Sequence, residues 1–84
     1  MMIEVPKHTR NIMSKAYSKI NSEHLEQLEL HANNVDEFLK LDNITDILDD
    51  TDTILTYLGF DENDDLTDFG RELQNLYDDI YYNN

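Results

Sequence analysis

Charge is the feature that most restricts how this chain can fold. In 84 residues, 19 acidic side chains stand against 6 basic ones, which gives a net charge of −13. Repulsion among like charges opposes collapse, and only 39% of the residues are hydrophobic, so little apolar area is available to offset the conformational entropy lost on folding. We therefore expect a small apolar core and a stability that increases with salt, because salt screens the repulsion.

Apolar residues recur at helical spacing along most of the chain, which predicts an all-α protein. The predicted helices cover residues 8–20, 23–41, 44–58 and 66–82, after an extended lead-in over residues 1–7. The clearest helix is 44–58, since Asn43 can cap its start and Gly59 suits its end. Strict alternation of apolar and polar residues, which would indicate a strand, is not found over four or more positions. The predicted fold class is a single acidic domain, a small bundle of about four helices.

The stretch 23–41 is the least regular of the predicted helices. Asn34 interrupts its apolar stripe and fits a capping box with Glu37, so we expect a bend or two short helices here. Three apolar residues fall off the main stripe: Leu30, Phe38 and Leu41. Surplus apolar positions of this kind suit either an irregular turn or the face of a homodimer, and both options stay open.

The sequence carries no motif for catalysis and no cysteine. His8, His24 and His31 follow no metal-ligand spacing such as H-E-x-x-H, and Gly59 and Gly70 are too few for a phosphate-binding loop. Paired carboxylates are plentiful, but acid–base catalysis needs them in a walled pocket that a small core is ill suited to build. We expect a protein that is not an enzyme and that holds neither a cofactor nor a metal.

Residues 61–72, D-E-N-D-D-L-T-D-F-G-R-E, resemble an EF-hand calcium loop. The first, third, fifth and twelfth ligand positions of that loop are occupied by Asp61, Asn63, Asp65 and Glu72. The sixth position, where the loop needs glycine, is Leu66, and the eighth, which is usually apolar, is Asp68. Leu66 also continues the apolar stripe of the predicted helix 66–82, which leaves no room for a twelve-residue loop. Calcium binding is therefore the weakest of the functions considered.

The charge is divided unevenly along the chain. Residues 1–20 hold four basic residues against Glu4, a net charge of +3, so residues 21–84 carry −16. From Asp36 to Asp79, fifteen acids stand beside two bases, Lys40 and Arg71. A protein that binds nucleic acid directly would show the opposite sign, so direct nucleic-acid binding is excluded. No stretch approaches the roughly 20 apolar residues of a membrane span and no signal peptide is recognised, so we expect no membrane association and a cytoplasmic location.

An acidic surface with helical spacing can imitate DNA. Carboxylates three or four residues apart on a helix lie about 5–6 Å from each other, and successive phosphates of a DNA strand lie roughly 6–7 Å apart. Such a surface fits a groove lined by Lys and Arg, and charge would steer the association. A net charge of about 2–8 is enough to keep a small domain soluble, so −13 favours a functional role for the acids.

The predicted partner-binding residues are acids of the second half of the chain, with Tyr57 as an aromatic anchor. They are Asp42, Asp46, Asp49, Asp50, Asp52, Tyr57, Asp61, Glu62, Asp64, Asp65, Asp68, Glu72, Asp78 and Asp79. Further anchors could come from Tyr77, Tyr81 and Tyr82. Charge reversal at Asp46, Asp49 and Asp50 is expected to weaken binding without unfolding the protein.

In size, charge and lack of catalytic motifs, the chain is similar to the DNA-mimic inhibitors that phages make against host nucleic-acid-binding proteins. The resemblance covers overall character and no motif, so no residue is carried over from that group. It implies a non-enzymatic inhibitor for host takeover, a basic DNA-binding protein of the host as partner, and the host cytoplasm as location.

An immunity protein or antitoxin that neutralises a cationic toxin is the alternative. Nuclease-colicin immunity proteins are also acidic four-helix domains of about this length, and they present acids beside a Tyr-Tyr pair. The C-terminal run Asp79-Ile80-Tyr81-Tyr82 resembles that element. A structural subunit or adaptor is a third hypothesis. Competing DNA separates the first two, because DNA displaces a DNA mimic from its partner and leaves an immunity complex intact.

Overall fold

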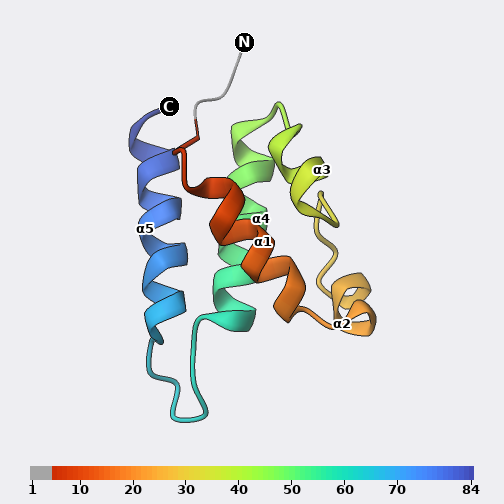
Figure 1. Ribbon diagram of the computed structural model, residues 1–84, viewed down its shortest axis with the longest axis vertical. Helices are drawn as coiled ribbons and strands as arrows, with labels where there is room; N and C mark the ends of the chain where they lie inside the picture. Colours follow the sequence, from red (N-terminus) through yellow and green to blue (C-terminus); the bar gives the residue numbers. More distant parts are fainter. Residues whose placement is uncertain (1–4) are drawn as a thin grey trace.

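The computed structural model of the protein describes residues 5–84, so the predicted lead-in over residues 1–7 lies mostly outside the described residues. The fold is all-α, as predicted from the apolar periodicity. Its helices are α1 (Thr9–Lys19), α2 (Ser22–Gln27), α3 (Val35–Leu39), α4 (Ile44–Leu58) and α5 (Asp68–Tyr82). In Figure 1, α4 and α5 form an antiparallel hairpin, α1 crosses in front of it, and α2 and α3 lie along the opposite side from α5. Within residues 5–84, no helix has the length and apolar character needed to cross a membrane.

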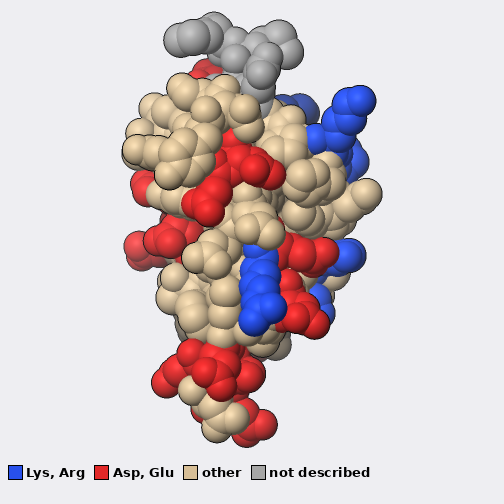
Figure 2. All heavy atoms as spheres, turned by 90° about the vertical axis from the view of Figure 1, so that its left-hand side faces the viewer, with Lys and Arg blue, Asp and Glu red and all other residues tan. Residues whose placement is uncertain are grey.

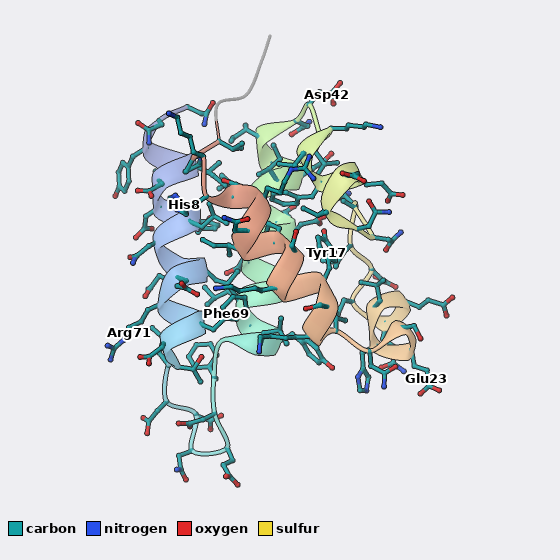
Figure 3. The ribbon with its side chains drawn as sticks, in the orientation of Figure 1. His8, Tyr17, Glu23, Asp42, Phe69 and Arg71 are labelled. Carbon is teal, nitrogen blue, oxygen red and sulfur yellow. The ribbon has the colours of Figure 1, made fainter. Side chains whose placement is uncertain are left out.

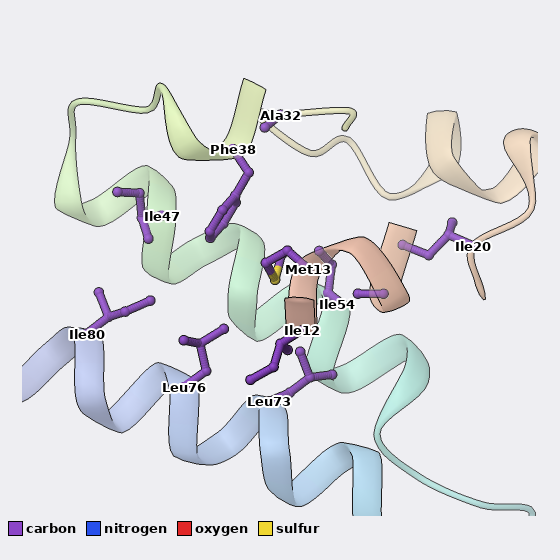
Figure 4. Close-up of a cluster of buried hydrophobic side chains, with 11 residues drawn as sticks. Ile12, Met13, Ile20, Ala32, Phe38, Ile47, Ile54, Leu73, Leu76 and Ile80 are labelled. Carbon is purple, nitrogen blue, oxygen red and sulfur yellow. The ribbon is translucent and has the colours of Figure 1, made fainter. Parts of the chain in front are cut away.

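The core lies where α1 crosses the α4–α5 hairpin. Figure 4 shows side chains from all three helices meeting there, with Phe38 reaching in from α3. The buried hydrophobic residues are Ile12, Met13, Ala16, Ile20, Ala32, Phe38, Ile47, Ile54, Leu73, Leu76 and Ile80. Burying this apolar area is the main favourable contribution to folding, at about 25 cal/mol per Å².

The predicted helix 23–41 is two short helices joined by residues 28–34. Glu29 ends the first with a positive φ of 54°. Asn34 begins α3 as predicted, since its side chain accepts a hydrogen bond from the Glu37 amide at 2.8 Å, while the Glu37 carboxylate accepts one from the Asn33 amide at 2.9 Å. This irregular connection changes the helical phase. It brings Phe38 into the core and leaves Leu30 and Leu41 half-buried against it, so an irregular turn accounts for all three surplus apolar residues.

The hairpin connection begins at Gly59 and ends later than expected. Helix α5 starts at Asp68, two residues after the predicted start, because Leu66 pairs with Phe60 in an antiparallel bridge and the Thr67 hydroxyl caps the helix through the Gly70 amide at 2.9 Å. The Gly59 carbonyl accepts the Thr67 amide at 2.8 Å. Gly59 and Gly70 also touch directly, since a Cβ atom on Gly70 would collide with the Gly59 carbonyl. The absence of a side chain at Gly70 therefore allows α5 to start against the end of α4.

Candidate partner-binding surface

One flank of α4 faces the segment of residues 21–34. Asp46, Asp50 and Tyr57 lie on this flank at intervals of four and seven residues, which places them on one side of a helix. Asp50 is only 1% exposed. Its Oδ1 accepts a hydrogen bond from the His31 amide and its Oδ2 one from the Ala32 amide, both at 2.9 Å. The assignment of Asp50 to a solvent-exposed acidic face was therefore wrong.

The surroundings of Asp50 define a buried polar contact between three parts of the chain. Burial raises the pKa of Asp50, while the His31 and Ala32 amides and the charge of His31 oppose the shift and Asp46 adds to it. From α1, the Tyr17 hydroxyl donates to the Ala32 carbonyl at 3.0 Å. Burial, together with the charges of Asp50 and Glu37, raises the pKa of Tyr17, so its hydroxyl stays protonated as a donor. In Figure 3, Tyr17 extends from α1 toward the α2–α3 connection.

The other two residues of this flank contact histidines. Asp46 is half-buried, with its Oδ1 3.5 Å from His31 Nε2. The Tyr57 hydroxyl lies 2.6 Å from His24 Nδ1 and 38% of the residue is exposed. Lysine at all three of Asp46, Asp49 and Asp50 would place a cation in the buried contact, so this reversal would change the packing of α4 as well as its surface charge. A charge test of α4 has to avoid Asp50.

The outward acids of α4 are Asp49 and Asp52, both exposed and three residues apart on the same helical face. On α5, Asp68, Glu72 and Asp79 are exposed on one flank, at intervals of four and seven residues. Asp78 is also exposed but points in a different direction, away from the buried side of α5. Exposed Asp42 lies in the turn before α4, at the opposite end of the molecule from the α4–α5 loop (Figure 3). The predicted acids are thus distributed over several faces.

The densest group of exposed carboxylates is at the α4–α5 loop. We call Asp61, Glu62, Asp64 and Asp65 the acidic tip; all four are exposed, and Figure 2 shows red side chains covering the projecting lower end of the molecule. The loop is ordered by Asp61, whose Oδ1 accepts the amides of Asn63 at 2.9 Å and Asp65 at 3.0 Å. Asp64 adopts a positive φ of 62°, a conformation that Asp and Asn tolerate.

This loop does not gather the ligand set expected of an EF-hand. The Asp61 carboxylate is engaged by amides of its own loop, and Glu72 lies within α5. Within residues 5–84, no group of three or more His, Cys, Asp or Glu side chains is placed to hold a metal ion. Leu66 lies outside α5, so the periodicity argument that placed it in the exit helix was wrong.

Basic residues occupy a different part of the surface. Lys7, Arg10, Lys15 and Lys19 are exposed on or just before α1. Arg10 pairs with Asp36 at 3.2 Å across an exposed contact. In Figure 2, most of the blue side chains gather along the edge toward α1, and the projecting end is red. Four of the six basic residues therefore lie on or just before α1, whereas Arg71 is exposed on α5 among the acids.

Exposed aromatic residues accompany the acids. Tyr81 and Tyr82 are 56% and 79% exposed and pack edge to face, with ring centroids 5.2 Å apart, next to Asp78 and Asp79. Phe60, beside the acidic tip, is 45% exposed. Phe60 was not among the predicted partner-binding residues, because a residue after a helix-ending glycine is expected to fold back onto the last turn.

Comparison with known proteins gives no relative for this chain: no family model matches it, and neither the curated proteins nor the solved structures yielded a match.

Proposed function

We propose that this protein is a non-enzymatic inhibitor that presents a DNA-like carboxylate surface to a basic nucleic-acid-binding protein and blocks its DNA site. The observation that carries the proposal is the acidic tip, four exposed carboxylates within five residues on an ordered loop at the end of the molecule. The amides bonded to Asp61 restrain the tip before any partner arrives, so little further ordering is needed on binding.

Exposed carboxylates also lie on the two helices that the tip joins. Asp49 and Asp52 continue the negative charge along α4, and Asp68 and Glu72 continue it along α5, with a spacing close to that of phosphates. Four of the six basic residues lie on or just before α1, and the exposed Arg71 lies on α5 between Asp68 and Glu72, so negative charge still predominates at the acidic tip and would steer a basic partner to it. Exposed Phe60 offers an apolar contact beside the charges, which matters because charge complementarity contributes more to rate and specificity than to affinity.

The test is capture of partners from bacterial lysate at low salt on the tagged protein, with excess duplex DNA as the eluting agent. The proposal predicts a DNA-binding protein that DNA releases. In a tip variant, Glu62→Gln, Asp64→Asn and Asp65→Asn remove three charges and keep Asp61, which orders the loop. This variant should lose the capture. A control variant with Glu23→Gln, Glu26→Gln and Glu29→Gln removes the same charge from exposed sites on and after α2, and it should retain the capture. A DNA-indifferent partner, or none, contradicts the proposal.

A second candidate is neutralisation of a cationic toxin. The exposure of Tyr81 and Tyr82 beside Asp78 and Asp79 favours it, since aromatic residues next to acids are suited to anchor a basic partner. In that case the captured protein would resist elution by DNA. Alanine at Tyr81 and Tyr82 would abolish capture, and the tip variant would retain it.

A further inference from the structure

A groove of about 380 Å³ lies between the end of α2 and the outer edge of α4. Its lining consists of Leu28, Asp52, Thr53, Thr56 and Tyr57. Asp52 is the one charged residue among these five. The groove therefore combines an aliphatic wall, an aromatic ring and a carboxylate.

The walls of the groove are held by contacts within the protein. The Tyr57 hydroxyl lies 2.6 Å from His24 Nδ1, and the two rings are tilted by 60° with centroids 5.6 Å apart, which restrains the Tyr57 ring. The Thr56 hydroxyl donates to the Asp52 carbonyl at 2.9 Å, so it is already used by the helix. By contrast, within residues 5–84 no hydrogen bond or ion pair engages the Asp52 carboxylate. The lining thus leaves one anionic group available to a ligand.

We propose that this groove receives an arginine side chain of the basic partner. The inference rests on the proposed function, which supplies a partner rich in Arg and Lys. The aliphatic part of the side chain would lie against Leu28, the guanidinium would stack on the exposed part of the Tyr57 ring, and it would pair with Asp52. Arginine fits better than lysine because its guanidinium is planar, more weakly hydrated and able to bond a carboxylate through two N–H groups. The net charge of −13 attracts a cationic partner to the protein before the two are in contact.

The experiment titrates the protein with two short peptides of equal length and charge, an arginine–glycine repeat and a lysine–glycine repeat. Methyl NMR signals of Leu28, Thr53 and Thr56 report on the groove. We expect the arginine peptide to shift these signals and to bind more tightly than the lysine peptide. Asp52→Asn should weaken binding of the arginine peptide by about threefold, the size expected for an exposed charge pair. Asp49→Asn is the matched control, since it removes the same charge from the same helix three residues away, and it should have a smaller effect.

The aromatic wall is tested separately. Tyr57→Phe keeps the ring, so preference for the arginine peptide should persist, whereas Tyr57→Leu should remove that preference. Equal effects of Asp52→Asn and Asp49→Asn, or peptide-induced shifts confined to the acidic tip, would overturn the groove as an arginine site. Those results would leave the lysate capture and its tip variant unaffected. Conversely, an arginine peptide that binds the groove as expected, with no DNA-releasable partner in lysate, would contradict the proposed function alone.

Discussion

The α4–α5 hairpin and the segment of residues 21–34 are held to the molecule in different ways. In the hairpin, Ile54 of α4 and Leu73 and Leu76 of α5 are fully buried. In the segment, none of the six residues of α2 is buried. What fixes the segment is a set of polar contacts to α4 and α1, made by His24, His31 and Ala32, together with half-buried leucines.

This difference predicts where the molecule opens first. Apolar burial in the hairpin contributes to global stability, and local openings with low free energies occur where few apolar contacts are lost. Residues 21–34 meet that description. The acidic tip belongs to the stable part of the molecule, whereas the groove at Tyr57 has one wall in the hairpin and the other in the less stable segment.

The largest expected effect is at the close contact inside the hairpin. Gly70→Ala would place a Cβ atom against the carbonyl carbon and oxygen of Gly59, and backbone atoms cannot move aside as a flexible side chain can. We expect a loss of about 3 kcal/mol or more in the free energy of unfolding, measured by urea titration. Gln74→Ala, on the exposed side of α5, is the control and should change little. Near-native stability of the Gly70 variant would show that the hairpin contact is not close.

The next effect is at the buried contact that holds the segment. Asp50→Asn keeps the size of the side chain but leaves one carbonyl oxygen to serve two amides, those of His31 and Ala32. We expect a loss of about 2 kcal/mol, with faster hydrogen exchange at those two amides. Asp49→Asn makes the same chemical change at an exposed neighbour and should stay within about 0.5 kcal/mol of the wild type. Equal effects of the two variants would contradict the role assigned to Asp50.

Stability should also depend on pH through Asp50. Burial raises its pKa above the unfolded value of 3.8, against the opposing His31 and Ala32 amides and the charge of His31. The folded state therefore holds this proton more tightly than the unfolded state. Protonation of Asp50 therefore increases the free energy of unfolding as pH falls through the folded pKa, and this contribution is absent at neutral pH. Asp46 and the Tyr17 hydroxyl are the other titratable groups that face this carboxylate or interact with its charge.

The measurement is urea unfolding at neutral pH and at about pH 5, for the wild type and for Asp50→Asn. Relief of self-repulsion at lower pH acts on both proteins, so the difference between them reports on Asp50 together with the His31 charge that interacts with it. We expect the wild type to gain more stability on acidification than the variant does. Identical gains would show that Asp50 titrates alike in the folded and unfolded states.

The smallest expected effect is at the exposed edge of the segment. Tyr57→Phe removes the hydroxyl that bonds His24, and we expect a loss of about 0.5 kcal/mol with faster amide exchange confined to α2. Tyr82→Phe, at a residue that is 79% exposed, is the control. If Tyr57→Phe lowered the free energy of unfolding no more than the control did, and the amides of α2 exchanged as in the wild type, the leucines alone would hold this helix.

Periodicity and end signals were enough to predict most of the helices. Helix α4 covers the residues predicted for it, because Asn43, an apolar stripe and Gly59 mark its limits within fifteen consecutive residues. The start of α5 was not predictable in the same way. Leu66 is in register with the apolar stripe, but a bridge to Phe60 and the cap at Thr67 hold it outside the helix. Contacts with the end of α4 therefore decide whether Leu66 joins the helix or the bridge.

The candidate site was also predicted only in part from the sequence. From the residues alone it follows that the second half of the chain is strongly acidic and that its exposed helical faces carry carboxylates, since charged side chains are rarely buried unless they are paired or hydrogen-bonded. Which acids stay exposed depends on partners distant in sequence. Asp49 and Asp50 are neighbours on one helix, yet one faces solvent and the other accepts two amides nearly twenty residues away. Hydrogen bonds to a distant turn compensate the cost of burying that carboxylate, and only the folded arrangement brings the turn to it.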